Sequence, residues 1–220
     1  HDYKINQLFN IMKYRQLISG CLFIISAGIL RGQHGEVTAK VFDKVFPTYN
    51  MGPDDPCTYF KDFRIPGMHF FRSSRSVYPY TFVNDYRPGK KNVEYEVVRL
   101  ENDLIYVDII PQLRGRIQGA VDKRNGWDFL YYNHVIKPAE IAVRSAWISG
   151  GLEYNHPGGH GYTQFSRISY DIIEGKDGSK TVVVAEIEPN RMMKWEFELT
   201  LRPGRLYLET RGRLISTHPY

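Results

Sequence analysis

Strict alternation of apolar and polar residues constrains the fold of this chain more than any other feature. In Trp195–Leu201 every odd residue is apolar and every even residue is polar. Because successive side chains of a β-strand point to opposite faces, this period of two predicts a strand with one face on a core. Similar patterns predict further strands at Val93–Leu100, Leu104–Ile110, Arg116–Asp122, Phe165–Ile173, Thr181–Glu188 and Arg205–Leu214.

Turn-forming sequences separate these segments, at Glu101–Asp103, Arg124–Gly126, Lys176–Gly178 and Pro203–Gly204. Asn, Asp and Gly in such positions favour the tight connections of β-hairpins. No amphipathic helical pattern follows residue 33. We therefore predict an all-β fold, an antiparallel β-sandwich.

The last predicted strand runs almost to the end of the chain without a terminating loop. A sheet that stopped there would keep an open edge. We therefore expect a sandwich over residues 93–220 that is truncated at its C-terminus, with a further C-terminal domain in the same protein.

The N-terminus resembles an export signal. Lys13 and Arg15 precede an apolar run of 14 residues, Leu17–Leu30, which is too short to span a bilayer comfortably. We predict that residues 1–11 are a translated leader or cloning remnant and that residues 12–32 are a secretory signal peptide. The mature protein would then be secreted or periplasmic, with no stable membrane span. A membrane anchor or a buried helix is the alternative.

Residues 33–92 are rich in Pro, Tyr, Phe and Arg and lack steady periodicity, so we expect an irregular wrap with one or two short strands. If Cys21 leaves with the signal, Cys57 stands alone and no internal disulfide can form. Lipidation at Cys21 stays open.

Charge argues against a nucleic-acid partner. Residues 1–33 hold four of the 29 basic and one of the 24 acidic residues, which leaves the remainder at a net charge of +2. No basic cluster follows, and binding to a phosphate backbone requires one.

The segment 149–162 combines a carboxylate, two imidazoles, an amide and aromatic rings with five glycines. Gly permits sharp turns and close approach to a ligand, so such a loop is typical of the rim of a site. Polar groups of these types bond sugar hydroxyls, while aromatic faces cover the apolar side of a sugar ring. The binding candidates here are Trp147, Tyr154, Asn155 and His156. A purely structural loop is the alternative.

Opening a sugar hemiacetal requires one group to take a proton and another to give one, so an imidazole and a carboxylate on opposite sides of a pocket would suffice. His160 and Glu153 are the catalytic candidates for these roles. Arg116 could fork onto a carboxylate or sugar hydroxyls, or could instead pin Glu153 or a loop carbonyl. Lys137 precedes Pro138, so its backbone should be extended and its amine could point into a cleft.

We expect no metal and no cofactor. The chain lacks a helical His-Glu-x-x-His pattern, and Pro157-Gly158-Gly159 prevents one helix from presenting both His156 and His160.

Several blocks together resemble one family, the bacterial domain of unknown function 5107. They are Leu100–Asn102, Ile110–Ile117, Ala120–Lys123, Val135–Ala139, Ala146–Glu153 and Met193–Trp195. That family is similar in fold to galactose mutarotase and the carbohydrate-binding β-supersandwich domains. Its members usually precede tetratricopeptide repeats in a longer secreted protein.

The resemblance implies a carbohydrate-recognising domain of an exported glycan-processing protein. One alternative is an aldose epimerase or a glycoside-cleaving enzyme, and another is a non-catalytic scaffold domain of a repeat protein. His160, in a His-Gly-Tyr context, is similar to the His-Gly-aromatic of hexose mutarotases. Family members tend to carry adjacent histidines followed by Arg-Pro, so only His160 is carried over.

The catalytic carboxylate of mutarotase-like enzymes lies late in the domain, and we expect this chain to end before it, so the resemblance assigns no complete catalytic pair. A glycosidase would need a second carboxylate, and Glu209 is the late candidate for it. We expect Arg116, Glu153 and His160 to converge on one concave face, because Gly150 and Gly151 permit the loop to fold back toward the strand that begins at Arg116. Trp147 or Tyr154 should form its wall.

Overall fold

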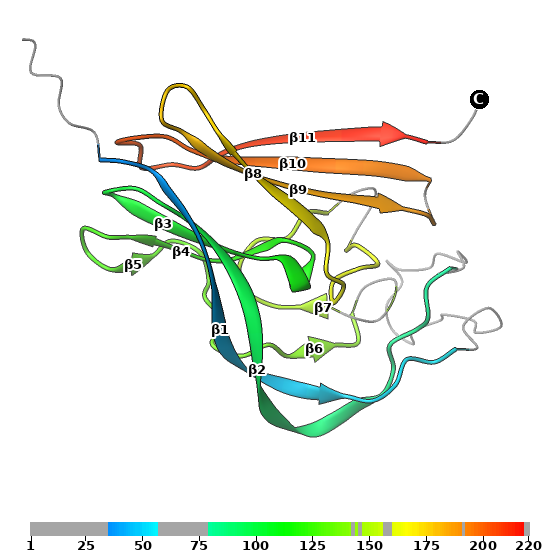
Figure 1. Cartoon of the computed structure of the whole chain (residues 1–220). Coiled ribbons are helices and arrows are strands. Elements are labelled where there is room, and N and C mark those ends of the chain that lie inside the picture. Colours follow the sequence, from blue (N-terminus) through cyan, green and yellow to red (C-terminus); the bar gives the residue numbers. More distant parts are fainter. Residues whose placement is uncertain are drawn as a thin grey trace, which may run out of the picture. The chain divides into compact units, whose positions relative to one another are not determined.

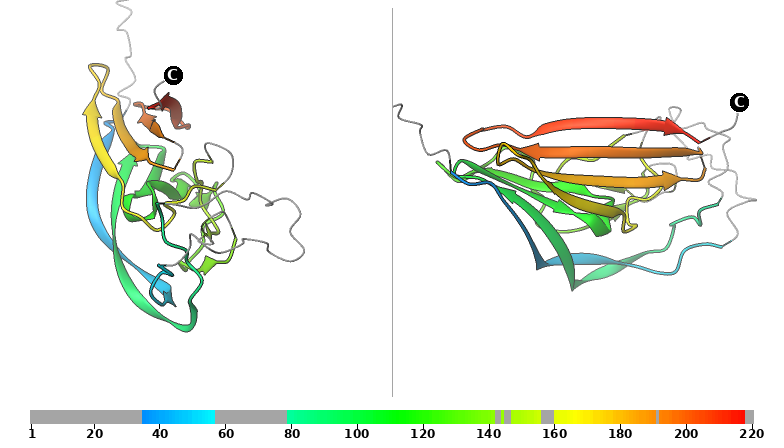
Figure 2. Two further views of the ribbon diagram at one scale, coloured as in Figure 1. Left: turned by 90° about the vertical axis from the view of Figure 1, so that its right-hand side faces the viewer. Right: turned by 45° about the horizontal axis from the view of Figure 1, so that its top comes forward.

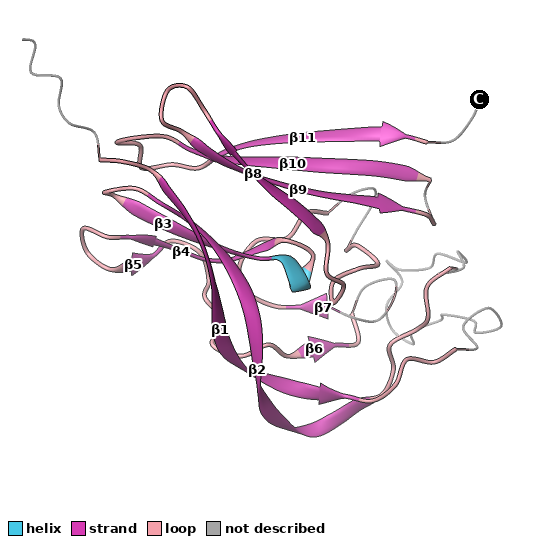
Figure 3. Ribbon diagram, in the orientation of Figure 1, coloured by secondary structure: helices cyan, strands magenta, loops and turns pink. Residues whose placement is uncertain are grey.

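The structure is a computed structural model that describes residues 35–56, 79–141, 144, 147–155, 160–190 and 192–217. The predicted leader and signal peptide, Cys21, Cys57 and His156 lie outside these residues. The all-β prediction is confirmed. Strands dominate, and the helical element in the described part of the chain is the short 3-10 turn Pro111–Leu113 (Figure 3). No described helix is long and apolar enough to cross a membrane.

One sheet has five antiparallel strands in the order β1-β2-β3-β4-β5 (Figure 1). They are β1 (Thr38–Met51), β2 (Tyr86–Glu101), β3 (Ile105–Ile110), β4 (Arg116–Asp122) and β5 (Trp127–Asp128). The β3–β4 register shifts at Asp108/Ile109. This bulge leaves Gln118 without an opposite residue in β3, and a bulge bends a strand.

The second sheet has four antiparallel strands in the order β11-β10-β9-β8. They are β8 (Ser169–Glu174), β9 (Lys180–Glu188), β10 (Met193–Leu201) and β11 (Glu209–Ser216). It packs over the first sheet as the other layer of a sandwich (Figure 2). A two-stranded sheet pairs β6 (Pro138–Ala139) with β7 (Trp147–Ile148).

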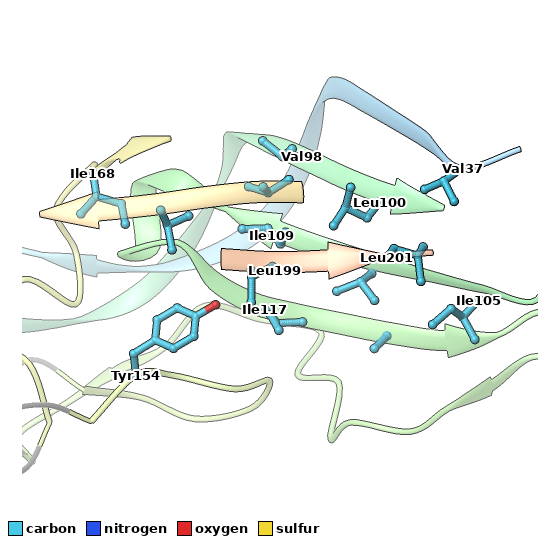
Figure 4. Close-up of a cluster of buried hydrophobic side chains, with 14 of the residues drawn as sticks. Val37, Val98, Leu100, Ile105, Ile109, Ile117, Tyr154, Ile168, Leu199 and Leu201 are labelled. Carbon is cyan, nitrogen blue, oxygen red and sulfur yellow. The ribbon is translucent and has the colours of Figure 1, made fainter. Parts of the chain in front are cut away.

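The main core lies between the two large sheets, and Figure 4 shows its aliphatic side chains. In β10, Trp195, Leu199 and Leu201 are fully buried, as the alternation predicts. They meet Leu100 of β2 and Ile109 of β3 from the opposite layer. A smaller cluster lies on the other face of the five-stranded sheet, formed by Phe46, Tyr95, Val97, Ile110, Leu113, Ile136 and Ile148.

Residues 38–51 differ from the expected irregular wrap. They form a 14-residue strand, paired with β2 from Thr38↔Glu101 to Met51↔Tyr86. Accordingly β2 begins at Tyr86 and not at Val93. Both faces of this hairpin are partly exposed, so its sequence lacks a clear period of two. The structure of β1 is decided by its pairing with a strand that is distant in sequence.

The predicted strand at 165–173 begins later, at Ser169. Residues 162–166 form a turn instead, in which the amide of Ser166 donates to the carbonyl of Thr163 at 2.9 Å. This turn keeps Thr163 and Gln164 next to the glycine-rich loop, where both side chains make hydrogen bonds.

Candidate functional site

The glycine-rich loop folds back onto β4, as predicted. Gly150 and Gly151 have φ angles of 87° and 63°, in the left-handed region that favours glycine. Leu152 then pairs with Ile117: each amide donates to the other's carbonyl, at 2.8 and 3.1 Å. The loop therefore extends the five-stranded sheet beside β4 and carries Glu153 with it.

Glu153 and His160 form the centre of the site. The Nδ1 atom of His160 is hydrogen-bonded to Oε1 of Glu153, so the two groups bond each other and do not lie on opposite sides of a pocket as expected. Gln164 donates from Nε2 to Oε2 of Glu153 at 2.6 Å, and the indole of Trp147 donates to Oε1 at 3.3 Å. The side chains of His160 and Glu153 are 23% and 14% exposed. The pair is thus fixed by protein donors and still reaches the surface.

Trp147 lies beside the pair. Its ring centroid is 5.8 Å from that of His160, and its side chain is partly exposed. β7 holds Trp147 in register with Ala139 of β6.

Arg116 takes the second of its two predicted roles, that of pinning a loop carbonyl. Its side chain is buried, and it donates to the carbonyl oxygens of Ile148, at 3.1 Å, and Gly150. Burial lowers the pKa of this guanidinium, and the nearby charge of Glu153 opposes that shift. Among the described residues no ion pair joins Arg116 to Glu153. Arg116 therefore holds the loop in place through its backbone carbonyls.

Arg114 is a site residue that sequence reasoning missed. It adopts a left-handed conformation (φ 60°) and is buried. It donates to the carbonyl of Tyr154 at 2.7 Å and to Oε2 of Glu186 at 3.4 Å. Burial lowers the pKa of the Arg114 guanidinium, whereas Glu186 chiefly, and Glu153 more weakly, act to raise it. A Cβ atom at position 161 would lie 2.1 Å from the Arg114 guanidinium, so a larger residue there would displace this side chain.

Glu186 connects Arg114 to the core. Its Oε2 accepts from Thr163 Oγ1 and from the indole of Trp195, both at 2.9 Å. The Arg114 guanidinium also lies 4.9 Å from the Trp195 ring centroid. No sequence signal marks Glu186, because it occupies an ordinary polar position of an alternating strand. Thr163 and Gln164 were missed because they lie between the glycine-rich segment 149–162 and the strand predicted from Phe165.

Tyr154 lies in the core and not along the wall of the site, where the sequence placed it as a candidate. Its ring stacks on Phe197 with a centroid distance of 4.3 Å and belongs to the main core, where Figure 4 shows it among aliphatic side chains. Only 6% of the residue is exposed, so it offers no ring face to a ligand. The alternation decides this placement, because Glu153 and Tyr154 point to opposite sides of an extended segment.

We expect Tyr154→Phe to leave the free energy of unfolding at neutral pH unchanged or to raise it by about 1 kcal/mol. No described residue bonds the buried Tyr154 hydroxyl, and removal of an unpartnered polar group relieves its desolvation cost.

The same variant should gain more at alkaline pH. Burial raises the pKa of Tyr154 in the folded state above the unfolded value of about 10, so unfolding releases a proton there and stability falls as pH rises past that value. Urea titrations at neutral pH and above about pH 10 test this. A clear loss at neutral pH would show that the hydroxyl has a stabilising partner.

The remaining candidates lie apart from Glu153 and His160 or outside the described residues. Lys137 is exposed, with its ammonium 5.0 Å from the ring centroid of Tyr49 in β1. Asn155 is exposed, and His156 lies outside the described residues. Glu209 accepts from Arg202 at 2.8 Å, at the end of β11 that pairs with Thr200. It therefore does not supply a second carboxylate beside Glu153. In the described part of the chain, no three His, Cys, Asp or Glu side chains cluster as metal ligands would.

Comparison with known proteins identifies a family and a similar solved structure. The family model described as Domain of unknown function (DUF5107) matches residues 72–219. A crystal structure of a TPR-domain containing protein from Parabacteroides distasonis matches with a TM-score of 0.70 and 26% sequence identity. That match covers 80% of this chain and 29% of the other, so this chain spans less than a third of that protein's length.

Proposed function

This chain belongs to the DUF5107 family, which is defined without an assigned function, and we propose that its sandwich recognises carbohydrate through Glu153 and His160. The observation that carries the proposal is the partly exposed Glu153–His160 pair, held by Gln164 and Trp147. The pair sits on a loop attached to a rigid strand, and binding residues are commonly presented in this way.

The chemistry of the site fits a hydroxylated ligand. A carboxylate accepts hydrogen bonds from hydroxyl groups, and an imidazole can accept or donate. Nδ1 of His160 is occupied by Glu153, which leaves Nε2 as the ring nitrogen that would meet a ligand. The Trp147 indole beside it supplies an aromatic surface for the apolar side of a sugar ring.

Buried polar atoms near the pair support a ligand-binding role. Among the described residues, Nε of Arg116 and Oε1 of Gln164 are buried and have no hydrogen-bond partner. Such atoms are uncommon in folded proteins and call for a functional explanation. Both belong to side chains that fix Glu153 or its loop.

An aldose epimerase activity is the second candidate. A carboxylate bonded to one nitrogen of an imidazole fixes its orientation and tautomer and makes the other nitrogen a competent base, and Glu153 holds His160 in this manner. A glycosidase is less well supported, because such enzymes need a second carboxylate across the bond to be cleaved. Glu186, which acts on Arg114 as Glu153 does, is already bonded by Arg114, Thr163 and Trp195.

We expect His160→Ala and Glu153→Gln each to weaken sugar binding by about 1–3 kcal/mol, because each leaves a hydroxyl or its buried partner unpaired. A neutral glycan array identifies the ligand, and calorimetric titration measures the change. Glu174→Gln, which alters a 76% exposed carboxylate at the end of β8, is the matched control and should bind as the parent does.

A sugar-rotation assay on the same variants separates the candidates. Mutarotation that His160→Ala abolishes would favour the epimerase, and binding without turnover would favour recognition alone. If no neutral glycan binds and no sugar mutarotates, the proposal fails and a scaffold role remains.

A further inference from the structure

A second feature able to bind a ligand lies away from Glu153 and His160. It is an open hollow of about 650 Å³, within the usual size range of small-molecule sites. Tyr106 and Asp108 of β3 line it, and they alternate with Val107 and Ile109 of the main core. The hollow therefore lies on the face of the five-stranded sheet that points away from this core.

The floor of the hollow is Gly119, and an aromatic wall stands against it. A Cβ atom at position 119 would lie 2.8 Å from the ring of Tyr132, so only glycine allows this close approach. The Tyr132 ring is also held edge-to-face by His134, at 4.8 Å between centroids, and by the Lys44 ammonium at 5.3 Å. The wall is thus fixed by packing on three sides.

Both lysines that line the hollow have an acidic partner, and Arg99, which does not line it, shares the partner of Lys44. Arg99 donates twice to the buried Asp108, at 2.6 and 2.9 Å, and Lys44 lies 3.6 Å from the same carboxylate. Lys123 donates to Glu101 at 2.8 Å. An anionic ligand would have to displace one of these carboxylates and would also face Asp128, so the charges favour a neutral ligand.

The polar groups that remain available are of mixed type. Oδ1 of Asp128 accepts from the amide of Ala120 at 3.2 Å, and no described residue bonds its Oδ2. The hydroxyls of Tyr106 and Tyr132 and the exposed His134 imidazole add donors and acceptors around the same space. Donors, acceptors and flat rings in one hollow suit a ring that carries several hydroxyl groups.

We propose that this hollow is a second binding site, for a neutral saccharide, built from Tyr106, Asp128, Tyr132 and His134. It shares no residue with the Glu153–His160 site, and the inference stands whether or not that site binds sugar. Two sites on one domain would let it hold a chain of sugar units at separate points and would raise its avidity for an oligosaccharide.

Amide NMR spectra of the full chain test the proposal, with cellobiose, maltose and lactose as neutral probes and glucuronate and inorganic phosphate as charged ones. We expect at least one neutral probe to shift the signals of Gly119, Tyr132 and His134. The double variant Tyr132→Phe/Asp128→Asn should weaken that binding at least about tenfold, because it removes a hydroxyl and a charged acceptor while it keeps the packing. Tyr131→Phe, at a neighbouring residue that is 75% exposed and does not line the hollow, is the matched control and should change nothing.

His160→Ala separates this proposal from the previous one. The shifts at Gly119, Tyr132 and His134 should persist in it, whereas binding at the first site should be lost. Shifts that disappear in His160→Ala would show a single site and overturn the inference. Binding of only glucuronate or phosphate at the hollow, or no shift with any neutral probe, would also overturn it, even if the first site binds sugar.

Discussion

Gly151→Ala is expected to lower the free energy of unfolding by about 3–5 kcal/mol, or to leave the protein insoluble, since domains of this size are stable by only about 5–15 kcal/mol. Gly151 has a φ of 63°, and a Cβ atom there would lie 2.1 Å from the carbonyl oxygen of Ile117. The clash is with backbone and cannot be relieved by a side-chain rotation. It would separate Leu152 from Ile117 and so detach the segment that carries Glu153.

Gly126→Ala is the matched control for this effect. Gly126 has a similar φ of 73°, yet nothing lies within 4 Å of the position that a Cβ would occupy. It should therefore show only the conformational cost of a left-handed alanine, about 1–2 kcal/mol. Urea unfolding of both variants measures the difference. Equal losses would mean that the loop can leave β4 without cost and that the pairing with Ile117 contributes little.

Trp195→Ala should lower the free energy of unfolding by about 3–5 kcal/mol, as is usual when a large core aromatic is truncated. Trp195 is fully buried in β10, with ring centroids 5.8 Å from Phe197 and 6.1 Å from Tyr154. The substitution would leave a cavity and would also remove the indole donor to Glu186. We expect the contact between Arg114 and Glu186 to become disordered as well.

Two companion variants separate these contributions. Trp195→Phe keeps most of the ring and loses the donor, so it should cost less, about 1–2 kcal/mol. Trp127→Ala truncates a residue that is 63% exposed in β5 and should stay within about 0.5 kcal/mol of the parent. Chemical denaturation followed by circular dichroism gives all three values. A loss in Trp127→Ala as large as in Trp195→Ala would contradict the assigned core.

The strands of the second sheet show how far the sequence alone could be read. β9 and β10 have one face on the core and one toward solvent, so their burial alternates and the period of two predicts both within about one to two residues. β1 gave no such signal. Its outer positions Val41 and Val45 are apolar and about half exposed, so burial and hydrophobicity do not coincide there.

Some features of the candidate site could likewise be predicted from the sequence, and others could not. The glycines at 150 and 151 predicted the turn that brings the loop to β4, because a positive φ is a local property. The direct bond between Glu153 and His160 was not predicted, since the sequence placed the two groups on opposite sides of a pocket. Arg114 and Glu186 are 72 positions apart, and neither carries a local mark of their contact. Arg116 was predicted with two alternatives, and only the position of the loop carbonyls selected between them.

The sequence by itself determined the fold class, the two-faced strands of the core and the loop that carries the pair. These properties follow from neighbours along the chain, through side-chain alternation and the conformational freedom of glycine. Only the tertiary structure decided that residues 38–51 are a strand, that Tyr154 packs into the core and that Tyr106 and Tyr132 enclose a hollow. Those outcomes depend on which distant surfaces meet, and a periodic pattern in one strand does not specify its partner.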